Sequence, residues 1–324
     1  MRVLGLCLLL ALGACAPTPR ASLEDAPALP SVSAGRIERL AIQPRELPPR
    51  PVDVWLPPGY PAAAPYPVIY MHDGQMLFDA GITWNRQEWR VDEVAAELIA
   101  SGEVPAFIVV GVWNAGPDRQ REYFPQRVYE ALEESTRETL RRQQRAGQRS
   151  LDAAEVRSDA YLRFLVDELK PRIDRDYRTA TDRSHTFVMG SSMGGLISMY
   201  AALEYPEVFG AAACLSTHWP GAIPFEPNPI PAAFRDYLSR RLPAPGWTRL
   251  YFDLGDATLD AYYPPLQAEV DALLRARGYG PAHWESVYVP GAEHSETAWA
   301  ARLDRPLRFL LGNLPPRQGA PSQR

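Results

Sequence analysis

The chain has 324 residues, 46% of them hydrophobic and 23% charged, and its formal net charge is −5. This length and apolar content support one sizeable domain with its own core, plus short additional segments. The basic residues form no dominant patch, which argues against nucleic acid as a partner.

The N-terminus has the pattern of a bacterial lipoprotein signal. Arg2 is followed by an apolar run that is too short to span a bilayer and that ends in Leu12-Gly-Ala-Cys15, a close match to the sequence cut by the lipoprotein signal peptidase. We therefore expect residues 1–15 to form the signal peptide and Cys15 to carry acyl chains that anchor the protein. An ordinary secretory peptide cut nearby is the alternative. Ala16 is not the aspartate that retains such proteins at the inner membrane, so the expected location is the periplasmic face of the envelope, on the outer membrane.

Composition suggests a tether and a tail around the folded domain. Residues 16–35 are rich in Pro, Ala and Ser without periodicity, which predicts a tether, and residues 316–324 are predicted to be disordered. Cys7 leaves with the signal and Cys15 would be lipidated, so Cys214 remains alone and no disulfide is expected. Cys214 lies in an apolar run and is interpreted as a buried small hydrophobe. The chain has no recognisable metal-ligand spacing.

Residues 36–315 alternate between strand and helix patterns. Two segments, at 36–43 and 51–56, alternate as an antiparallel hairpin. The later strands are expected at about 66–71, 106–112, 186–191, 210–215, 248–254 and 284–289, and the helices at about 87–100, 159–174, 193–205, 264–277 and 296–311. This rhythm predicts an α/β fold with a mostly parallel central sheet and helices on both faces.

The loop after the strand at 66–71 is a candidate for binding a developing negative charge. It reads His72-Asp-Gly-Gln-Met76, and Gly74 would let the backbone bend close to a substrate. We expect the backbone N–H of Gln75 to point into the site, with an ordinary turn as the alternative.

Residues 114–158 interrupt the rhythm. The stretch 128–150 is strongly charged and helix-prone, with opposite charges spaced to pair along a helix surface. It is interpreted as a solvated surface helix, and the alternative is a lid or membrane-facing element.

The most informative segment runs from Thr186 to Leu196. It reads as a buried strand, the pattern Gly-x-Ser-x-Gly centred on Ser192, and a helix that opens with small residues. This is the context of a nucleophile elbow, in which a strained turn presents the serine at the sheet edge beside a helix N-terminus. The backbone N–H of Met193, the next residue, is the expected first donor to the oxyanion.

A serine nucleophile needs a base and an orienting acid. Of five histidines, His294 is the expected base, because it lies in a loop of small residues after the last strand. His72 and His218 also follow strands and are weaker candidates for lining the site, whereas His185 and His283 are interpreted as strand-edge residues. For the acid, Asp253 lies inside a strand and is interpreted as structural, while Asp260 is preferred over Asp256 because it ends the loop.

Three segments carry a resemblance to a known family. Residues 70–79 (YMHDGQMLFD), 190–196 (GSSMGGL) and 291–299 (GAEHSETAW) resemble the esterase D-like, or putative esterase, branch of the α/β-hydrolases, which includes feruloyl esterases, S-formylglutathione hydrolases, enterobactin-type siderophore esterases and mycolyltransferases. The resemblance covers residues 37–314 and implies an α/β-hydrolase fold. In the feruloyl esterases the acid precedes a helix that contains a glutamine, and the spacing of Asp260 to Gln267 fits this pattern.

These features predict a serine carboxylic-ester hydrolase that works through an acyl-enzyme and needs no cofactor. Trp113, Trp219 and Tyr262 follow sheet strands or the acid loop and are expected to contact substrate, which would suit a bulky or aromatic acyl group. The substrate is expected to be a small-molecule or saccharide ester, such as a siderophore lactone or a feruloyl or acetyl saccharide. The alternatives are an envelope acyltransferase with the same triad and a non-catalytic, lipid-anchored binding protein.

Overall fold

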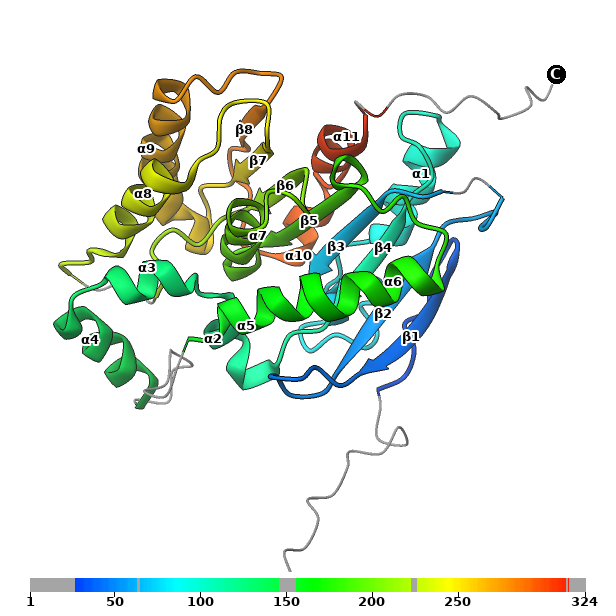
Figure 1. Ribbon diagram of the computed structural model, residues 1–324, viewed down its shortest axis with the longest axis horizontal. Coiled ribbons are helices and arrows are strands. Elements are labelled where there is room, and N and C mark those ends of the chain that lie inside the picture. Colours follow the sequence, from blue (N-terminus) through cyan, green and yellow to red (C-terminus); the bar gives the residue numbers. More distant parts are fainter. Residues whose placement is uncertain (1–26, 63–64, 146–155, 223–225, 313, 315–324) are drawn as a thin grey trace, which may run out of the picture.

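One twisted sheet of eight strands runs through the molecule (Figure 1). The computed structural model describes residues 27–62, 65–145, 156–222, 226–312 and 314. The strands are β1 Arg36–Ile42, β2 Arg50–Leu56, β3 Val68–His72, β4 Ile108–Val112, β5 Thr186–Ser191, β6 Ala211–Leu215, β7 Arg249–Leu254 and β8 Trp284–Tyr288.

The strand order is β1-β2-β4-β3-β5-β6-β7-β8. Strand β2 pairs antiparallel with both β1 and β4, and every later pair is parallel. The prediction of a mostly parallel sheet that begins with an antiparallel hairpin is confirmed. Because the parallel strands end at one edge, the loops after β3, β5, β7 and β8 meet there.

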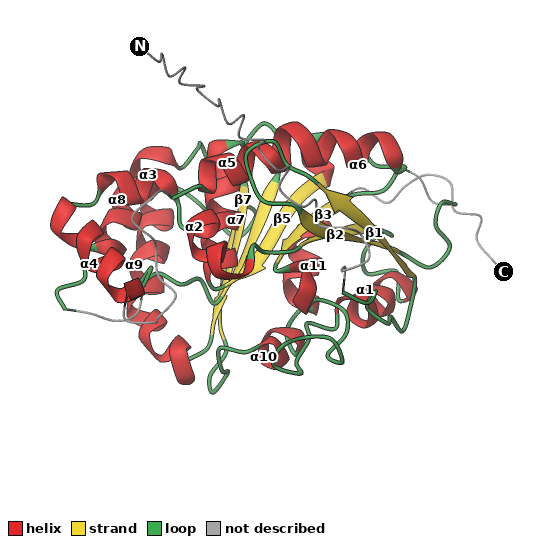
Figure 2. Ribbon diagram, turned by 90° about the horizontal axis from the view of Figure 1, so that it is seen from below, coloured by secondary structure: helices red, strands yellow, loops and turns green. Residues whose placement is uncertain are grey.

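Helices cover both faces of the sheet, as Figure 2 shows for α5, α6 and α7 on one side and α1, α10 and α11 on the other. The helices are α1 Val91–Ala100, α2 Arg119–Tyr123, α3 Gln126–Ala131, α4 Glu134–Arg145, α5 Ser158–Arg163, α6 Lys170–Asp176, α7 Met193–Glu204, α8 Ile230–Arg241, α9 Tyr263–Ala276, α10 Glu296–Ala300 and α11 Asp304–Leu311.

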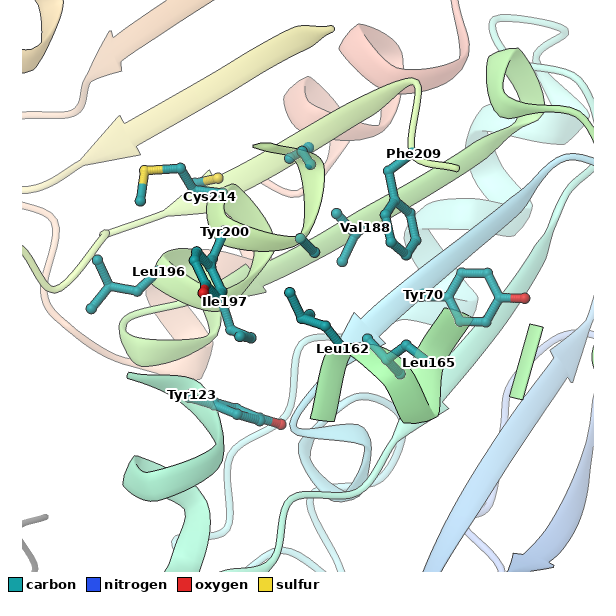
Figure 3. Close-up of a cluster of buried hydrophobic side chains, with 14 of the residues drawn as sticks. Tyr70, Tyr123, Leu162, Leu165, Val188, Leu196, Ile197, Tyr200, Phe209 and Cys214 are labelled. Carbon is teal, nitrogen blue, oxygen red and sulfur yellow. The ribbon is translucent and has the colours of Figure 1, made fainter. Parts of the chain in front are cut away.

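The sheet divides the core into two hydrophobic clusters. Along β5, Val188 points into the cluster under α5, α6 and α7, whereas Phe187 and Met189 point into the cluster under α1 and α11. This alternation follows from the two-residue period of a strand. Figure 3 shows part of the first cluster, in which Leu196 and Ile197 of α7 lie near Val188. Cys214 is fully buried here, as expected, and burial raises the pKa of its thiol.

Several helix boundaries differ from the sequence prediction for local reasons. Helix α1 begins at Val91 and not near residue 87, because Arg90 adopts a left-handed backbone with φ 54°. The expected helix at 159–174 is continuous from Ser158 to Asp176 but contains a π-helical stretch, Phe164–Leu169. The expected helix at 296–311 is broken after Ala300 into α10 and α11.

The charged insertion is only partly a surface element. Glu122 on α2 is buried and forms an ion pair with Arg50 of β2, with N–O distances of 2.6 and 2.7 Å. Val128 and Leu140 are also fully buried, so α3 and α4 contribute to the core. The rest of the predicted charged helix, residues 146–150, lies outside the described residues.

The described part of the expected tether lies against the domain. The backbone N–H groups of Ser31 and Ser33 donate to the carboxylates of Asp79 and Asp92, at 2.9 and 2.6 Å. The indole of Trp55 donates to the carbonyl of Ala34 at 2.8 Å. From residue 27 onward the chain is therefore hydrogen-bonded, and the predicted signal peptide with Cys15 and the predicted tail at 316–324 lie outside the described residues.

Candidate active site

Ser192 occupies the sharp turn between β5 and α7 that the sequence predicts. Its backbone has φ 58° and ψ −122°, a conformation that residues with side chains rarely adopt. The turn is possible because strand and helix approach closely: a Cβ on Gly190 would lie 2.8 Å from the carbonyl oxygen of Gly194. Packing therefore requires glycine at 190, whereas a Cβ on Gly194 would meet only side-chain atoms of Asp73 and His72, at 3.3 and 3.4 Å. The turn presents the serine at the sheet edge.

His294 and Asp260 meet at the same edge. Nδ1 of His294 lies 2.6 Å from Oδ1 of Asp260, and the backbone N–H of His294 donates to the hydroxyl of Thr258 at 2.8 Å. Asp260 is fully buried. Burial by itself would raise the pKa of Asp260, but hydrogen bonds from His294, Ser216 and Gly255 outweigh it and hold this pKa below its ordinary value. Asp260 is therefore ionised at neutral pH and oriented toward the imidazole.

The two rival aspartates have other partners. Asp256 accepts hydrogen bonds from the backbone N–H of Gly291 at 2.6 Å and from the hydroxyl of Tyr288, so it ties the loop after β7 to the loop after β8. Asp253 is fully buried and pairs with Arg302, with an N–O distance of 2.9 Å. Of the three candidates, the structure places Asp260 against His294.

Ser192 and His294 line one cavity of about 890 Å³. Asp73, Gln75, Asn114 and Arg119 also line it, and so do Trp84, Trp89 and Trp299. Trp84 lies on the loop between β3 and α1 and is 84% exposed, which is unusual for an indole. The cavity thus combines aromatic walls with several polar side chains and has room for an organic substrate.

Arg119 and Asp73 form a charged pair in the cavity wall. Two guanidinium nitrogens of Arg119 donate to the Asp73 carboxylate at 2.6 and 2.7 Å, and the side-chain amide of Asn114 donates to it at 2.6 Å. Burial would raise the pKa of Asp73, but the Arg119 charge and these hydrogen bonds lower it. The pair joins the loop after β3 to α2 and leaves this wall close to electrically neutral.

The predicted oxyanion donors lie on the two expected loops. Met193 begins α7 directly after the nucleophile, and Gln75 lines the cavity from the short helix Gly74–Met76. The oxygen of the Gln75 side chain accepts the backbone N–H of Asn114 at 3.2 Å. The reason for glycine at 74 differs from the expected one: a Cβ there would lie 2.4 Å from the backbone of Gly111, so packing against β4 requires it.

The three predicted substrate contacts are not brought to the cavity. The indole of Trp113 donates to Asp53 at 2.8 Å and stacks with Arg39, at the antiparallel end of the sheet. Trp219 is 1% exposed and packs against Phe234 and Phe252 in the core. Tyr262 is 53% exposed but does not line this cavity. Position after a strand does not determine where a side chain points, and none of the three lines this cavity.

Tyr263, which follows the acid loop directly after Tyr262, lies at the site. Its buried hydroxyl is 2.7 Å from Nδ1 of His218. Its ring packs edge-to-face against His294, with centroids 5.8 Å apart. Burial lowers the pKa of His218 to about 3, so this histidine is a neutral hydrogen-bond partner.

The remaining histidines have structural partners. Nδ1 of His72 lies 2.8 Å from the hydroxyl of Tyr161, and burial lowers the pKa of His72 to about 3. His185 is paired with Asp182, and His283 directly precedes β8. Across the described ranges, no group of three or more His, Cys, Asp or Glu side chains is arranged to hold a metal ion.

Curated relatives match about half of the chain. It is 30% identical to "Ferri-bacillibactin esterase BesA" of Bacillus subtilis over 165 residues, which is 49% of this chain and 50% of the relative. It is 26% identical to "Uncharacterized protein YjcH" of the same organism over 158 residues, 48% of this chain and 51% of the relative. The chain therefore spans about half the length of these relatives.

Solved structures share the fold over most of the chain. A ferulic acid esterase superposes with a TM-score of 0.59 and 19% identity, covering 86% of this chain and 98% of that one. The enterobactin esterase FES from Shigella flexneri superposes with a TM-score of 0.61 and 18% identity, covering 88% and 60% of the two chains. These likenesses show an α/β-hydrolase fold. The sequence model of the family described as "Putative esterase" matches residues 48–310, so the chain belongs to that family.

Proposed function

We propose that this protein is a serine carboxylic-ester hydrolase with Ser192 as nucleophile, His294 as base and Asp260 as acid. The observation that carries the proposal is the 2.6 Å contact between His294 and Asp260 at a cavity that Ser192 also lines. Membership of an esterase family supports a carboxylic ester as the substrate class.

The proposed reaction proceeds in two halves. Ser192 attacks the ester carbonyl while Nε2 of His294 accepts its proton, and Asp260 fixes the imidazole tautomer and stabilises its charged form. The N–H groups of Met193 and Gln75 stabilise the oxyanion, and the imidazole then protonates the leaving alcohol. Water, deprotonated by His294, attacks the acyl-enzyme and releases the carboxylic acid.

The nucleophile is tested by Ser192→Ala. This change should lower hydrolysis of a short p-nitrophenyl ester by at least about 10³-fold and abolish labelling by a fluorophosphonate, because the attacking oxygen is lost. Ser198→Ala is the matched control: Ser198 is a buried serine on α7 whose hydroxyl donates to the Gly194 carbonyl, and its loss should leave both readouts intact. Retained turnover in Ser192→Ala would remove Ser192 as the nucleophile.

The substrate is proposed to be a bulky ester, such as a siderophore lactone or a feruloyl or acetyl saccharide. A cavity of about 890 Å³ with the exposed indole of Trp84 supports a large organic group. A panel of these esters, with product analysis in the presence and absence of added alcohol, separates hydrolysis from acyl transfer.

A lipid anchor at Cys15 on the periplasmic face of the outer membrane is a second, independent proposal that rests on the N-terminal sequence. None of the helices in the described ranges has the length and apolar content to cross a bilayer. In cells of a bacterial host, the wild type should sediment with membranes and Cys15→Ser should not, because the acylated thiol is lost. Equal membrane recovery of the two proteins would contradict the anchor.

A further inference from the structure

A buried hydroxyl lies directly behind the proposed catalytic acid. Ser216 is the first residue after β6, is fully buried, and has φ 41°, in the left-handed region that disfavours residues with side chains. Its backbone N–H donates to the carbonyl oxygen of Asp253 at 2.8 Å. The surrounding contacts therefore hold Ser216 in a conformation that it would not adopt by itself.

The direction of each hydrogen bond at this hydroxyl follows from counting donors. The indole N–H of Trp299 and Nη2 of Arg302 each lie 2.9 Å from Oγ of Ser216, and both groups can only donate. They occupy the two lone pairs of the oxygen. The single hydrogen of Ser216 is then directed to its remaining neighbour, Oδ2 of Asp260, at 2.6 Å.

This arrangement assigns different tasks to the two oxygens of Asp260. Oδ2 accepts from Ser216 and from the backbone N–H of Gly255 at 2.7 Å, and Oδ1 is left to face Nδ1 of His294. Two donors on one oxygen favour the ionised carboxylate, and the group cannot rotate without breaking both bonds.

Arg302 is itself held by a buried partner. Its Nη2 lies 2.9 Å from Oδ1 of Asp253, and its Nη1 donates to the carbonyl of Ala298 at 3.1 Å. The positive charge is thus balanced by Asp253 and not by Asp260, whose partner is the imidazole. The other ionisable groups around the acid are Tyr263 and His218 beside His294, and Asp256 on the loop after β7.

We propose that Ser216 and Arg302 are positioning residues of the catalytic acid: Arg302 and Trp299 orient the Ser216 hydroxyl, which fixes Asp260 as an ionised carboxylate with one oxygen reserved for His294. The inference rests on the proposed function, since it assigns Asp260 the role of the acid.

The test is Ser216→Gly, because glycine removes the hydroxyl and accepts the positive φ. The Asp260 carboxylate then keeps only the Gly255 donor on Oδ2 and is held less firmly, so kcat should fall by about 10- to 100-fold with KM within twofold of wild type. A carboxylate with one donor fewer also attracts protons more strongly, so the acidic limb of the pH–rate profile should move to higher pH. Arg302→Lys keeps the charge but loses the forked geometry. It should change kcat and the acidic limb in the same direction as Ser216→Gly, but by less.

A measurement that does not depend on turnover separates this inference from the proposed function. The imidazole proton between His294 and Asp260 should give a downfield proton NMR signal, to be assigned by its loss in Asp260→Asn. That signal should shift in Ser216→Gly and stay in place in the control Ser198→Ala. Unchanged kcat, pH profile and signal in Ser216→Gly, in an enzyme that still labels at Ser192, would overturn the inference alone. A shifted signal in a protein that fluorophosphonate does not label would support the positioning contacts and overturn the hydrolase.

Discussion

At the scale of single residues, two aspartates four positions apart have separate tasks. Asp260 is buried against His294, whereas Asp256 binds the backbone of Gly291 at the surface side of the same loop. Both are carboxylates in a polar loop, so residue type alone did not distinguish them, and the sequence left Asp256 open as an alternative. What distinguishes them is the hydrogen bond to the imidazole of His294, which Asp260 makes and Asp256 does not.

This difference predicts opposite outcomes for the same substitution. Asp260→Asn should lower kcat by about 10³- to 10⁴-fold, because an amide holds the wrong imidazole tautomer and does not stabilise its charge. Asp256→Asn should change kcat by no more than about threefold, since its partners are Gly291 and Tyr288. Steady-state kinetics with one p-nitrophenyl ester measures both. A comparable loss in the two variants would mean that Asp256, or the loop as a whole, carries the acid's role.

Some site residues were predictable and others were not. Ser192 and His294 were predictable because the elbow demands glycines at fixed offsets and the base must follow the last strand. Trp113 and Trp219 were assigned to the substrate because each follows a strand, but their rings turn toward Asp53 and toward the core. Ser216 carries no local signal at all, since its contact to Asp260 depends on how distant loops meet.

At the scale of elements, the strands were predicted best. Their apolar runs are nearly continuous because most of the sheet is covered on both faces. Helix ends were predicted less well, as the break between α10 and α11 shows. The break also bears on the proposed site, because Arg302 lies in it and its guanidinium contacts Ser216 and Asp253.

The insertion at 114–158 shows that a charged residue in the sequence is not always exposed to solvent. Glu122 belongs to a charged stretch, yet it is 1% exposed because Arg50 of β2 neutralises it through two short contacts. Asn114, Gly116 and Arg119 line the cavity, whereas none of the described residues of α3 and α4 does. Residues at the start of the insertion therefore form the cavity wall, and the alternative of a lid gains no support from α3 and α4.

At the scale of the whole molecule, two buried imidazoles make stability depend on pH. Burial lowers the pKa of His72 and that of His218 to about 3, whereas histidine in an unfolded chain titrates near pH 6.5. Between these values the unfolded chain binds more protons at these two rings than the folded one, so their contribution to stability falls as pH falls. Each ring should account for about 2 kcal/mol of unfolding free energy between pH 7 and pH 5.

Urea unfolding at the two pH values measures this loss. His72→Asn removes one titrating ring and should reduce the loss by about 2 kcal/mol relative to wild type, while its amide can still reach the Tyr161 hydroxyl. The comparison is made between the two proteins because burial raises the pKa of Asp92 to about 7, which acts in the opposite direction in both of them. An equal change in unfolding free energy from pH 7 to pH 5 in wild type and variant would show that the His72 imidazole is not held neutral by burial.

One short stretch near the end of the folded chain, residues 294–302, supplies the imidazole together with Trp299 and Arg302, whose side chains reach Ser216 behind the acid. This stretch is synthesised after the elbow, the loop that contains Gln75, and Asp260. Because N-terminal parts of a chain fold first during synthesis, Ser192 is present without its proposed proton acceptor while residues 193–293 are made. The proposed reactive centre is therefore complete only when this last stretch has docked.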